Sequence, residues 1–315
     1  MSNQITGYAY RSRDAIAQMD FRILAAFAAT YIVWGSTYLA VSVALTSIPP
    51  FLLMGSRSLL GGLILFAYAR RDGAQFPARA WLISGACGLL LFVGCHGVMA
   101  FAQQRVPSGI TAIILATIPC WIAIIGIAVP GKKPAKLRTL ALLIPGIAGV
   151  ALIAWQQVAT AQGDLRLFDV ILLLGASFAW ALGSILLERN TAPGMSTFAL
   201  SGAALIVGGL ALLGVSAAMG EFQQFRFAEL TAASASGWVY LVLAGTVIAF
   251  GSYVWLLGRV PPTLVATYTF VNPIIAVLLG WVFLGEAFTG LTLLGGALVV
   301  GSIMALLGSD QWLKN

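Results

Sequence analysis

The chain has 315 residues, of which 60% are apolar and only 9% are charged. Soluble domains carry about 25% charged residues, so this composition excludes an ordinary soluble protein and predicts an integral membrane protein in contact with the lipid bilayer. The net charge of +7 is compatible with a nucleic-acid partner. However, the chain has no basic cluster with interleaved aromatic residues, which argues against nucleic-acid binding.

Apolar stretches of about 20 residues recur along the chain, and this is the length at which an α-helix crosses the hydrocarbon core of a bilayer. Ten such stretches occur, joined by short connections that hold nearly all of the charge. The expected fold class is therefore an all-α integral membrane protein with ten transmembrane helices. The expected spans are residues 22–46, 50–69, 80–102, 106–130, 137–157, 167–187, 196–219, 236–257, 261–284 and 288–308.

The distribution of Lys and Arg predicts the orientation of the chain. With the N-terminus placed inside, thirteen of the 17 basic residues fall on inner segments, and three (Arg105, Arg166 and Arg226) fall on outer loops. The positive-inside rule then places both termini in the cytoplasm, with tails at residues 1–21 and 309–315. The first apolar run is too long for the core of a signal peptide, so we expect the N-terminal tail to be retained.

The two halves of the chain are similar to each other. Because each half holds five spans, an odd number, the halves must insert in opposite orientations, which is the plan of inverted-repeat transporters. We expect one five-helix repeat at residues 22–158 and the other at residues 165–308. The matches are Arg105-Val106-Pro107 on Arg259-Val260-Pro261 and Pro119 on Pro273 at an offset of 154 residues, Trp34 on Trp180 at 146, and Gly61-Gly62-Leu63 on Gly208-Gly209-Leu210 at 147.

Aromatic and polar side chains near the middle of the spans are candidates for substrate binding. Trp34 and Trp180 lie mid-span, whereas tryptophan in membrane proteins usually collects at the interfaces. In the third and eighth spans, aromatic and polar residues recur at the spacing of an α-helix. These side chains either line an amphipathic cavity between the repeats or pack the helices together. The candidates are Trp34, Tyr38, His96, Trp180, Phe250, Tyr253, Tyr268 and Asn272.

Two prolines lie deep within the fourth and ninth spans. Pro119 and Pro273 have no N–H group, so the carbonyls of Leu115 and Thr269 lose their helical donors and we expect a kink at each position. A freed carbonyl beside Thr269 is a candidate polar site. The alternative is a packing kink whose carbonyl is satisfied by a neighbouring helix.

His96 and Arg57 are the most unusual polar residues within the spans. His96 is the only histidine, and it either contacts substrate, exchanges a proton or acts as a neutral hydrogen-bonding partner. Arg57 lies seven residues after Pro50, roughly 10 Å into the second span, and its side chain is expected to reach toward the outer interface. It is either a clamp for a substrate carboxylate or a structural cation bonded to backbone carbonyls.

Several kinds of chemistry have no matching residues in this sequence. No Asp or Glu lies near the centre of a span, which argues against a carboxylate proton relay. There is no Walker loop for ATP, no ligand spacing for a metal, and no serine with a histidine and acid partner, so neither a cofactor nor an enzymatic activity is expected. The three cysteines all fall within apolar runs and form no disulfide framework.

Four features of the sequence are typical of one transporter family: Trp34-Gly35-Ser36-Thr37-Tyr38, Val106-Pro107-Ser108-Gly109-Ile110-Thr111-Ala112, Tyr268-Thr269-Phe270-Val271-Asn272-Pro273 with Gly285-Glu286, and Arg57 in the second span. Through these features the sequence resembles the EamA family of the drug/metabolite transporter superfamily, over residues 22–308. The resemblance implies ten helices in two inverted five-helix repeats around a central cavity, in the bacterial inner membrane. It also implies export of amino acids, other metabolites or toxic compounds.

One departure limits this resemblance. The four-helix multidrug members of the superfamily use a glutamate in their first helix for proton coupling, whereas the first span here has no acid. Their antiport mechanism therefore does not carry over.

The expected function is secondary export of small amphipathic metabolites, such as amino acids including aromatic ones, across the inner membrane by alternating access. One alternative is a multidrug exporter that binds aromatic cations by stacking, although the cavity has no acid to pair with them. A second alternative is a membrane sensor or scaffold that transports nothing, which the short loops disfavour. No feature of the sequence assigns a coupling ion or an oligomeric state.

Overall fold

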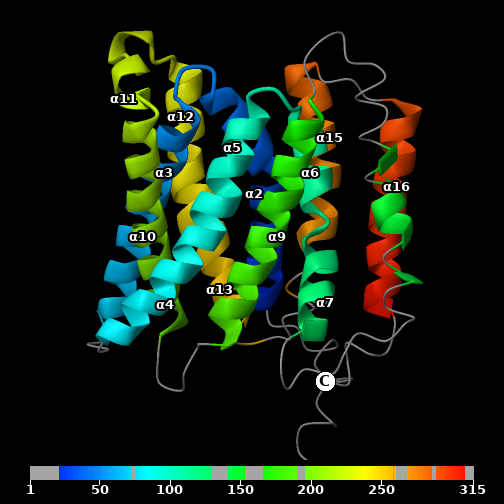
Figure 1. Cartoon of the computed structure of the whole chain (residues 1–315), viewed down its shortest axis with the longest axis horizontal. Helices are drawn as coiled ribbons and strands as arrows, with labels where there is room; N and C mark the ends of the chain where they lie inside the picture. Colours follow the sequence, from blue (N-terminus) through cyan, green and yellow to red (C-terminus); the bar gives the residue numbers. More distant parts are fainter. Residues whose placement is uncertain are drawn as a thin grey trace, which may run out of the picture.

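The structure is a computed structural model, and every regular element that it describes is a helix, as expected (Figure 1). Seven continuous helical runs are long and apolar enough to cross a membrane, and two shorter apolar helices follow in the last part of the chain. About half of the expected span at residues 137–157, and all of both tails except Phe21, lie outside the described residues. The described residues are 21–71, 76–128, 141–142, 144–149, 151–152, 166–189, 196–257, 259, 265, 268–285 and 289–308.

Most of the described spans begin and end within two residues of their expected limits. The eighth is an exception, because its helix begins at Ala232, where the Thr231 side chain accepts a hydrogen bond from the Ser234 N–H and caps the helix. The helices are α2 (Phe21–Ala44), α3 (Pro50–Arg70), α4 (Ala78–Gly88), η1 (Leu89–Gly97), α5 (Val98–Gln103), α6 (Ser108–Leu115), α7 (Ile118–Ala128), α9 (Leu167–Arg189), α10 (Thr197–Ala218), α11 (Glu221–Gln224), η2 (Phe227–Glu229), α12 (Ala232–Tyr240), η3 (Leu241–Phe250), α13 (Gly251–Leu257), α15 (Tyr268–Leu284) and α16 (Gly290–Gly308).

Helices α3 and α10 cross with their backbones in contact. A β-carbon added at Gly62 would lie 2.8 Å from the Ile206 nitrogen, and one added at Gly209 would lie 2.6 Å from the Leu59 nitrogen. Gly62 of α3 thus meets Ile206 of α10, and the earlier residue Leu59 meets the later residue Gly209. The two helices therefore run antiparallel. The two contacts also exchange under the offset of 147 residues that relates the halves of the sequence. Small residues permit this approach, which any side chain would obstruct.

A third helix joins this crossing through glycine. A β-carbon at Gly88, the last residue of α4, would lie 2.3 Å from the Ala204 carbonyl oxygen, and one at Gly208 would lie 2.7 Å from the Gly88 carbonyl oxygen. Helix α10 is therefore held against both α3 and the α4–η1 helix by direct backbone packing.

The two halves of the chain are interlocked rather than side by side. Helix α2, from the first half, packs against α12, η3, α13 and α15 of the second half. Helix α9, from the second half, packs against α4, η1, α5, α6 and α7 of the first half (Figure 1). Each half therefore contributes its first helix to a core made largely by the other half.

The fourth span is broken, not merely kinked as expected. Helix α6 ends at Leu115 and α7 begins at Ile118, which makes Pro119 the second residue of α7. A proline in the first turn of a helix costs no hydrogen bond, because that N–H group would have no helical partner. The Thr117 hydroxyl, within the break, lies 3.0 Å from the Ser177 hydroxyl of α9. Pro273 differs, because α15 continues through it.

The third and eighth spans contain π-helical segments in equivalent places. Segment η1 falls on residues 243–251 under the offset of 154 residues, so it overlaps η3 almost completely. In η3 the Thr246 hydroxyl donates to the Leu241 carbonyl five residues earlier, at 2.9 Å. The expectation of regular α-helical spacing in these spans is therefore wrong at this depth. Wide π-turns of this kind are frequent at functional sites.

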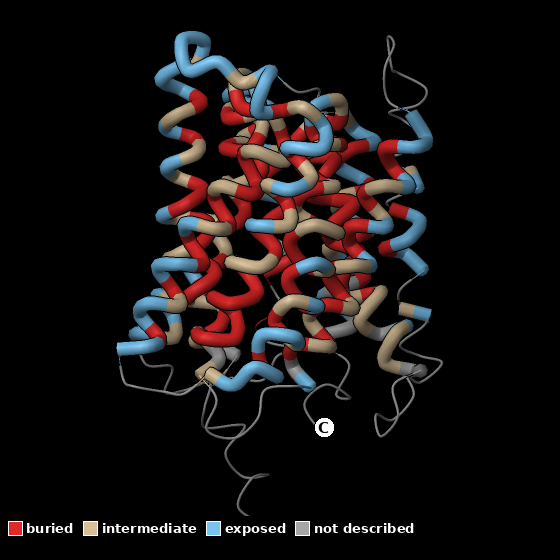
Figure 2. Tube along the Cα trace, turned by 60° about the vertical axis from the view of Figure 1, so that its left-hand side comes forward, coloured by how far each residue is buried: buried red, intermediate tan, exposed pale blue. Residues whose placement is uncertain are grey.

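The buried residues lie in the interior of the bundle (Figure 2), and many large apolar side chains are exposed on its outside. Leu82 is 78% exposed, Val282 61% and Leu293 59%. Large exposed aliphatic side chains on several helices are expected where the neighbouring solvent is lipid.

We expect Gly209→Ala to lower the midpoint of thermal unfolding, because the new methyl group meets the backbone of α3. The cost of such overpacking is about 1–3 kcal/mol. Gly214→Ala in the same helix is the matched control, because nothing lies within 4 Å of its added β-carbon. Both variants gain helix propensity, so their difference in detergent reports the contact itself. Equal midpoints would contradict the close packing of α3 and α10.

Candidate functional site

Aromatic residues from both halves form one cluster at the middle of the bundle. The ring of Trp34 in α2 lies 4.6 Å from that of Tyr268, 5.1 Å from Tyr253, and 6.4 Å from both Phe250 and Trp180, measured between centroids. These partners come from α15, α13, η3 and α9. The structure thus brings together five of the eight side chains that the sequence singles out for substrate binding.

Trp34 is also fixed by a hydrogen bond across the repeats. Its indole Nε1 donates to the Gly245 carbonyl at 3.0 Å. This bond joins α2 to the π-helical segment η3 and sets the plane of the central ring. Trp34 therefore has both a position and an orientation imposed by the second half of the chain.

His96 joins the same cluster from the other π-helical segment. Its ring lies 5.1 Å from Trp180 and 5.4 Å from Phe92, and Phe92 in turn lies 6.1 Å from Phe250. His96 and Phe250 are equivalent under the offset of 154 residues, as are Phe92 and Thr246. The two π-helical segments thus present corresponding side chains to one centre. The buried Nδ1 of His96 has no hydrogen-bond partner in the described part of the chain.

A small cavity lies within this cluster. Its volume is about 10 Å³, which is room for roughly one water molecule, so the side chains close the centre of the protein in this conformation. Both halves contribute to its wall. The lining residues are Trp34, Arg57, Phe92, His96, Leu205, Gly245, Thr246 and Phe250.

Five of the eight expected substrate contacts do not line this cavity. Trp180, Tyr253 and Tyr268 belong to the ring cluster around Trp34, whereas Tyr38 and Asn272 lie one turn further along their helices. Tyr38 is one turn beyond Trp34 in α2, and its carbonyl accepts a hydrogen bond from the Gln103 amide of α5 at 2.6 Å. Asn272 is one turn beyond Tyr268 in α15, and its buried Oδ1 has no partner among the described residues. Neither side chain lines the cavity that the structure shows.

Arg57 lines the cavity and does not reach the outer interface, so that expectation is wrong. Its side chain is 5% exposed. The contact that it makes is from Nη1 to the Met54 sulfur at 3.7 Å, and its Nε has no partner in the described structure. Arg57 shares this cavity with Trp34 of α2 and His96 of η1, which its position along the helix alone did not predict.

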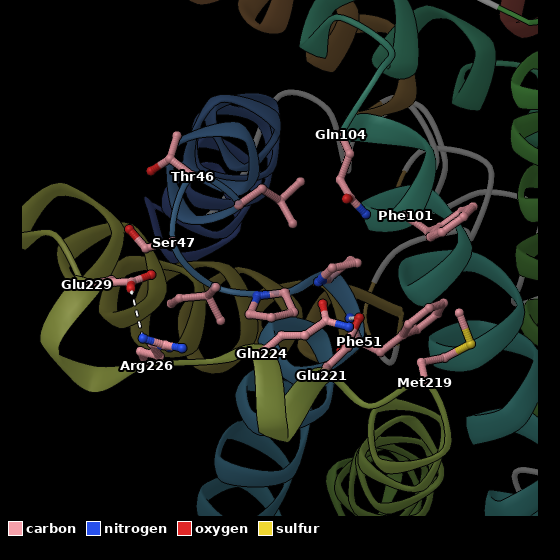
Figure 3. A pocket seen from close by; sticks show the side chains of 14 residues that line it. Thr46, Ser47, Phe51, Phe101, Gln104, Met219, Glu221, Gln224, Arg226 and Glu229 are labelled. Atoms are coloured by element: carbon pink, nitrogen blue, oxygen red, sulfur yellow. Dashed lines mark hydrogen bonds and ion pairs between the residues drawn. The ribbon is translucent and has the colours of Figure 1, made fainter.

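A larger pocket of about 410 Å³ opens at the end of the bundle where α11 lies, and we call it the vestibule (Figure 3). Glu221 lies in its wall, and its carboxylate accepts hydrogen bonds from the Phe51 N–H at 3.2 Å and the Leu52 N–H at 2.8 Å. These are first-turn donors of α3, which has prolines at its start and no side-chain cap of its own. The lining residues are Leu45, Thr46, Ser47, Ile48, Pro49, Pro50, Phe51, Phe101, Gln104, Met219, Glu221, Gln224, Arg226 and Glu229.

A partly buried ion pair joins the two halves at the same end. Arg105, next to the vestibule residue Gln104, binds Asp169 in the first turn of α9, with 2.5 Å between Nη2 and Oδ1, and Asp169 is fully buried. Arg259, the equivalent of Arg105, instead lies 4.0 Å over the Trp255 ring and pairs with no described carboxylate. Sequence reasoning missed this pair, although Asp169 is the only acid of the sequence that falls within an expected span, at residues 167–187.

The described residues offer no constellation for catalysis or metal binding. No three side chains among the His, Cys, Asp and Glu residues of the described segments lie close enough to hold a metal ion. Cys87, Cys95 and Cys120 are buried free thiols within the helices.

Comparison with known proteins agrees with this arrangement. Residues 21–155 and 167–308 each match the EamA-like transporter family. The inner membrane transporter YedA of Escherichia coli strain K12 is 34% identical over 300 residues, which cover 91% of each chain.

Two more distant proteins are also similar. A probable amino-acid metabolite efflux pump of Escherichia coli strain K12 is 22% identical over 90% of this chain and 94% of its own. A crystal structure with 19% identity has a TM-score of 0.65, and the match covers 93% of this chain and 99% of that one. The duplicated match and the similarity to YedA show that the chain belongs to the EamA-like transporter family, as a multi-pass membrane transporter and not an enzyme.

Proposed function

We propose that the protein is a secondary exporter of small amphipathic metabolites, including aromatic amino acids, which works by alternating access. The observation that carries this proposal is the aromatic cluster around Trp34, built from both halves about one closed cavity. Ring faces bind apolar and aromatic groups, and a few polar groups orient them. The amino-acid metabolite efflux pump among the relatives is consistent with such a substrate.

The proposed architecture is ten helices in two inverted repeats, at residues 22–158 and 165–308, with the tails at 1–21 and 309–315 in the cytoplasm of the cell. The antiparallel contacts at Gly62 and Gly209 support it, because an in-plane two-fold axis would exchange them. The excess of Lys and Arg on alternate connections supports the orientation. In this orientation the vestibule faces outward.

Transport requires the centre to open in turn to each side. A substrate of amino-acid size does not fit a cavity of about 10 Å³, so the rings must separate to admit it. The break between α6 and α7 beside Pro119, and Pro273 within α15, are the positions at which helices can bend. We assign substrate contact in the opened state to Trp34, Tyr38, His96, Trp180, Phe250, Tyr253, Tyr268 and Asn272.

The multidrug alternative has less support. A cavity for aromatic cations would need an acid or an uncharged wall, whereas this cavity has Arg57 in its wall and no carboxylate among its lining residues. A sensor or scaffold has no need for a buried cavity shared by two repeats.

We expect purified protein in proteoliposomes to exchange at least one radiolabelled aromatic amino acid faster than protein-free vesicles do. The measurement is counterflow of phenylalanine, tyrosine, tryptophan and a set of aliphatic amino acids. Exchange of cationic dyes and of no amino acid would favour the multidrug alternative. The absence of any exchange would contradict the proposed function.

Trp34→Ala should lower exchange by about tenfold or more, because each lost ring contact is worth roughly 0.5–1.5 kcal/mol and 1.4 kcal/mol is a factor of ten. Trp34→Phe should retain more activity, because it keeps a ring. Trp281→Ala is the control, since Trp281 in α15 is 55% exposed on the outer surface. Folding is checked by size-exclusion chromatography, and equal exchange by the Trp34 and Trp281 variants would remove Trp34 from the pathway.

Asp169→Asn should favour the state that is open at the vestibule, because it removes the charge of the buried carboxylate that ties α9 to Arg105 of the other half. The reporter is Cys95, which is buried beside His96, in a variant with alanine at Cys87 and Cys120. A membrane-impermeant maleimide added outside should react faster with Cys95 in the Asp169→Asn variant than in the parent. The double variant Arg105→Asp with Asp169→Arg, which reverses the ion pair, should react more slowly again. Glu229→Gln breaks the exposed pair with Arg226 at the same end and should change nothing. Equal rates throughout would show that Arg105 and Asp169 do not hold the outer end closed.

A further inference from the structure

The guanidinium of Arg57 is buried with few acceptors. An arginine side chain presents five N–H donors, and burial without acceptors is unfavourable for a cation. Here the side chain is 5% exposed, its Nη1 lies 3.7 Å from the weakly accepting sulfur of Met54, and its Nε has no partner in the described structure. A structural arginine within a membrane span would bind backbone carbonyls, whereas no described carbonyl accepts a hydrogen bond from this one.

The other polar groups of the cavity do not supply the missing acceptor. The Gly245 carbonyl already accepts from the Trp34 indole, and the Thr246 hydroxyl donates to the Leu241 carbonyl. His96 contributes a buried Nδ1 without a partner of its own. The cavity therefore holds a cation and an imidazole whose hydrogen bonds are incomplete.

The described carboxylate side chains bind groups other than Arg57. Asp169 binds Arg105, and Glu221 binds the first N–H groups of α3. Glu229 pairs with Arg226 at the rim of the vestibule, where both are exposed. None of these three is within ion-pair distance of Arg57, so no carboxylate among the described side chains neutralises it, and a ligand can supply the negative charge that suits this site.

The walls of the cavity indicate what else the ligand carries. Trp34, Phe92 and Phe250 contribute aromatic surface to the cavity that Arg57 and His96 line. A simple inorganic anion would gain little from these rings, whereas a carboxylate joined to an apolar or aromatic group would use both kinds of contact.

We infer that Arg57, assisted by His96, is the binding site for the carboxylate of the transported molecule, so that the substrates are apolar or aromatic carboxylic acids. This inference rests on the proposed export function and specifies its substrate class. The carboxylate accepts hydrogen bonds from the guanidinium while the apolar group packs on the rings around Trp34. Molecules with the same apolar group but without the carboxylate are excluded, because they leave the guanidinium buried and unpaired.

The test is competition against exchange of radiolabelled phenylalanine and tryptophan in proteoliposomes of the full chain. The competitors are 3-phenylpropanoate, which keeps the carboxylate and lacks the amine, and phenylethylamine, which keeps the amine and lacks the carboxylate. We expect 3-phenylpropanoate to inhibit and phenylethylamine not to. Arg57→Gln should raise the KM for phenylalanine by roughly ten- to a hundredfold and abolish inhibition by 3-phenylpropanoate, while Arg57→Lys retains part of both.

Arg71→Gln is the matched control, since Arg71 directly follows the same helix and is exposed. Inhibition by phenylethylamine equal to that by 3-phenylpropanoate, or an Arg57→Gln variant with unchanged KM, would overturn the carboxylate site while leaving transport in place. Exchange of no compound by the wild type would instead overturn the proposed function. If Arg57→Gln does not fold, the competition on the wild type decides.

Discussion

The contact between α3 and α10 is the constraint on which the rest of the structure depends. Backbone meets backbone at Gly62 and Gly209, so the two helices approach more closely than any side chain would allow. The same stripe of glycines brings η3 onto α3, where a β-carbon at Gly61 would lie 2.3 Å from the Thr246 side chain. Arg57 and Thr246 line one cavity, and the absence of a side chain at Gly61 lets their helices approach this closely.

Around this contact, the charged and titratable groups differ in how they are paired. Near the α11 end of the bundle, Glu221 caps α3 and Asp169 binds Arg105. At the centre, the Arg57 Nε and the His96 Nδ1 have no partner in the described structure. Polar groups are costly at membrane depth, so incomplete hydrogen bonding is expected where a ligand completes it. The aromatic rings around the closed cavity and the Arg57 guanidinium thus form one amphipathic site.

The sequence was sufficient for the spans and for much of the cluster, because both follow from composition and from the internal repeat. Trp34 and Trp180 stood out since mid-span tryptophan is unusual, and they do meet. The π-helical segments were not predictable, because uniformly apolar runs carry no clear period. The direction of Arg57 depended on the packing of three other helices. The break at Pro119 differs from the continuous helix at Pro273 although the residues match, because local turns are set by tertiary contacts such as that of Thr117 with Ser177.

The most direct test of a shared central site is an electron cryo-microscopy structure of the full chain in nanodiscs with saturating phenylalanine. We predict ligand density between the ring of Trp34 and the guanidinium of Arg57, with the rings of Tyr253 and Tyr268 displaced from Trp34 to make room. Density confined to the vestibule beside Glu221, with the central ring contacts unchanged, would contradict transport through this site.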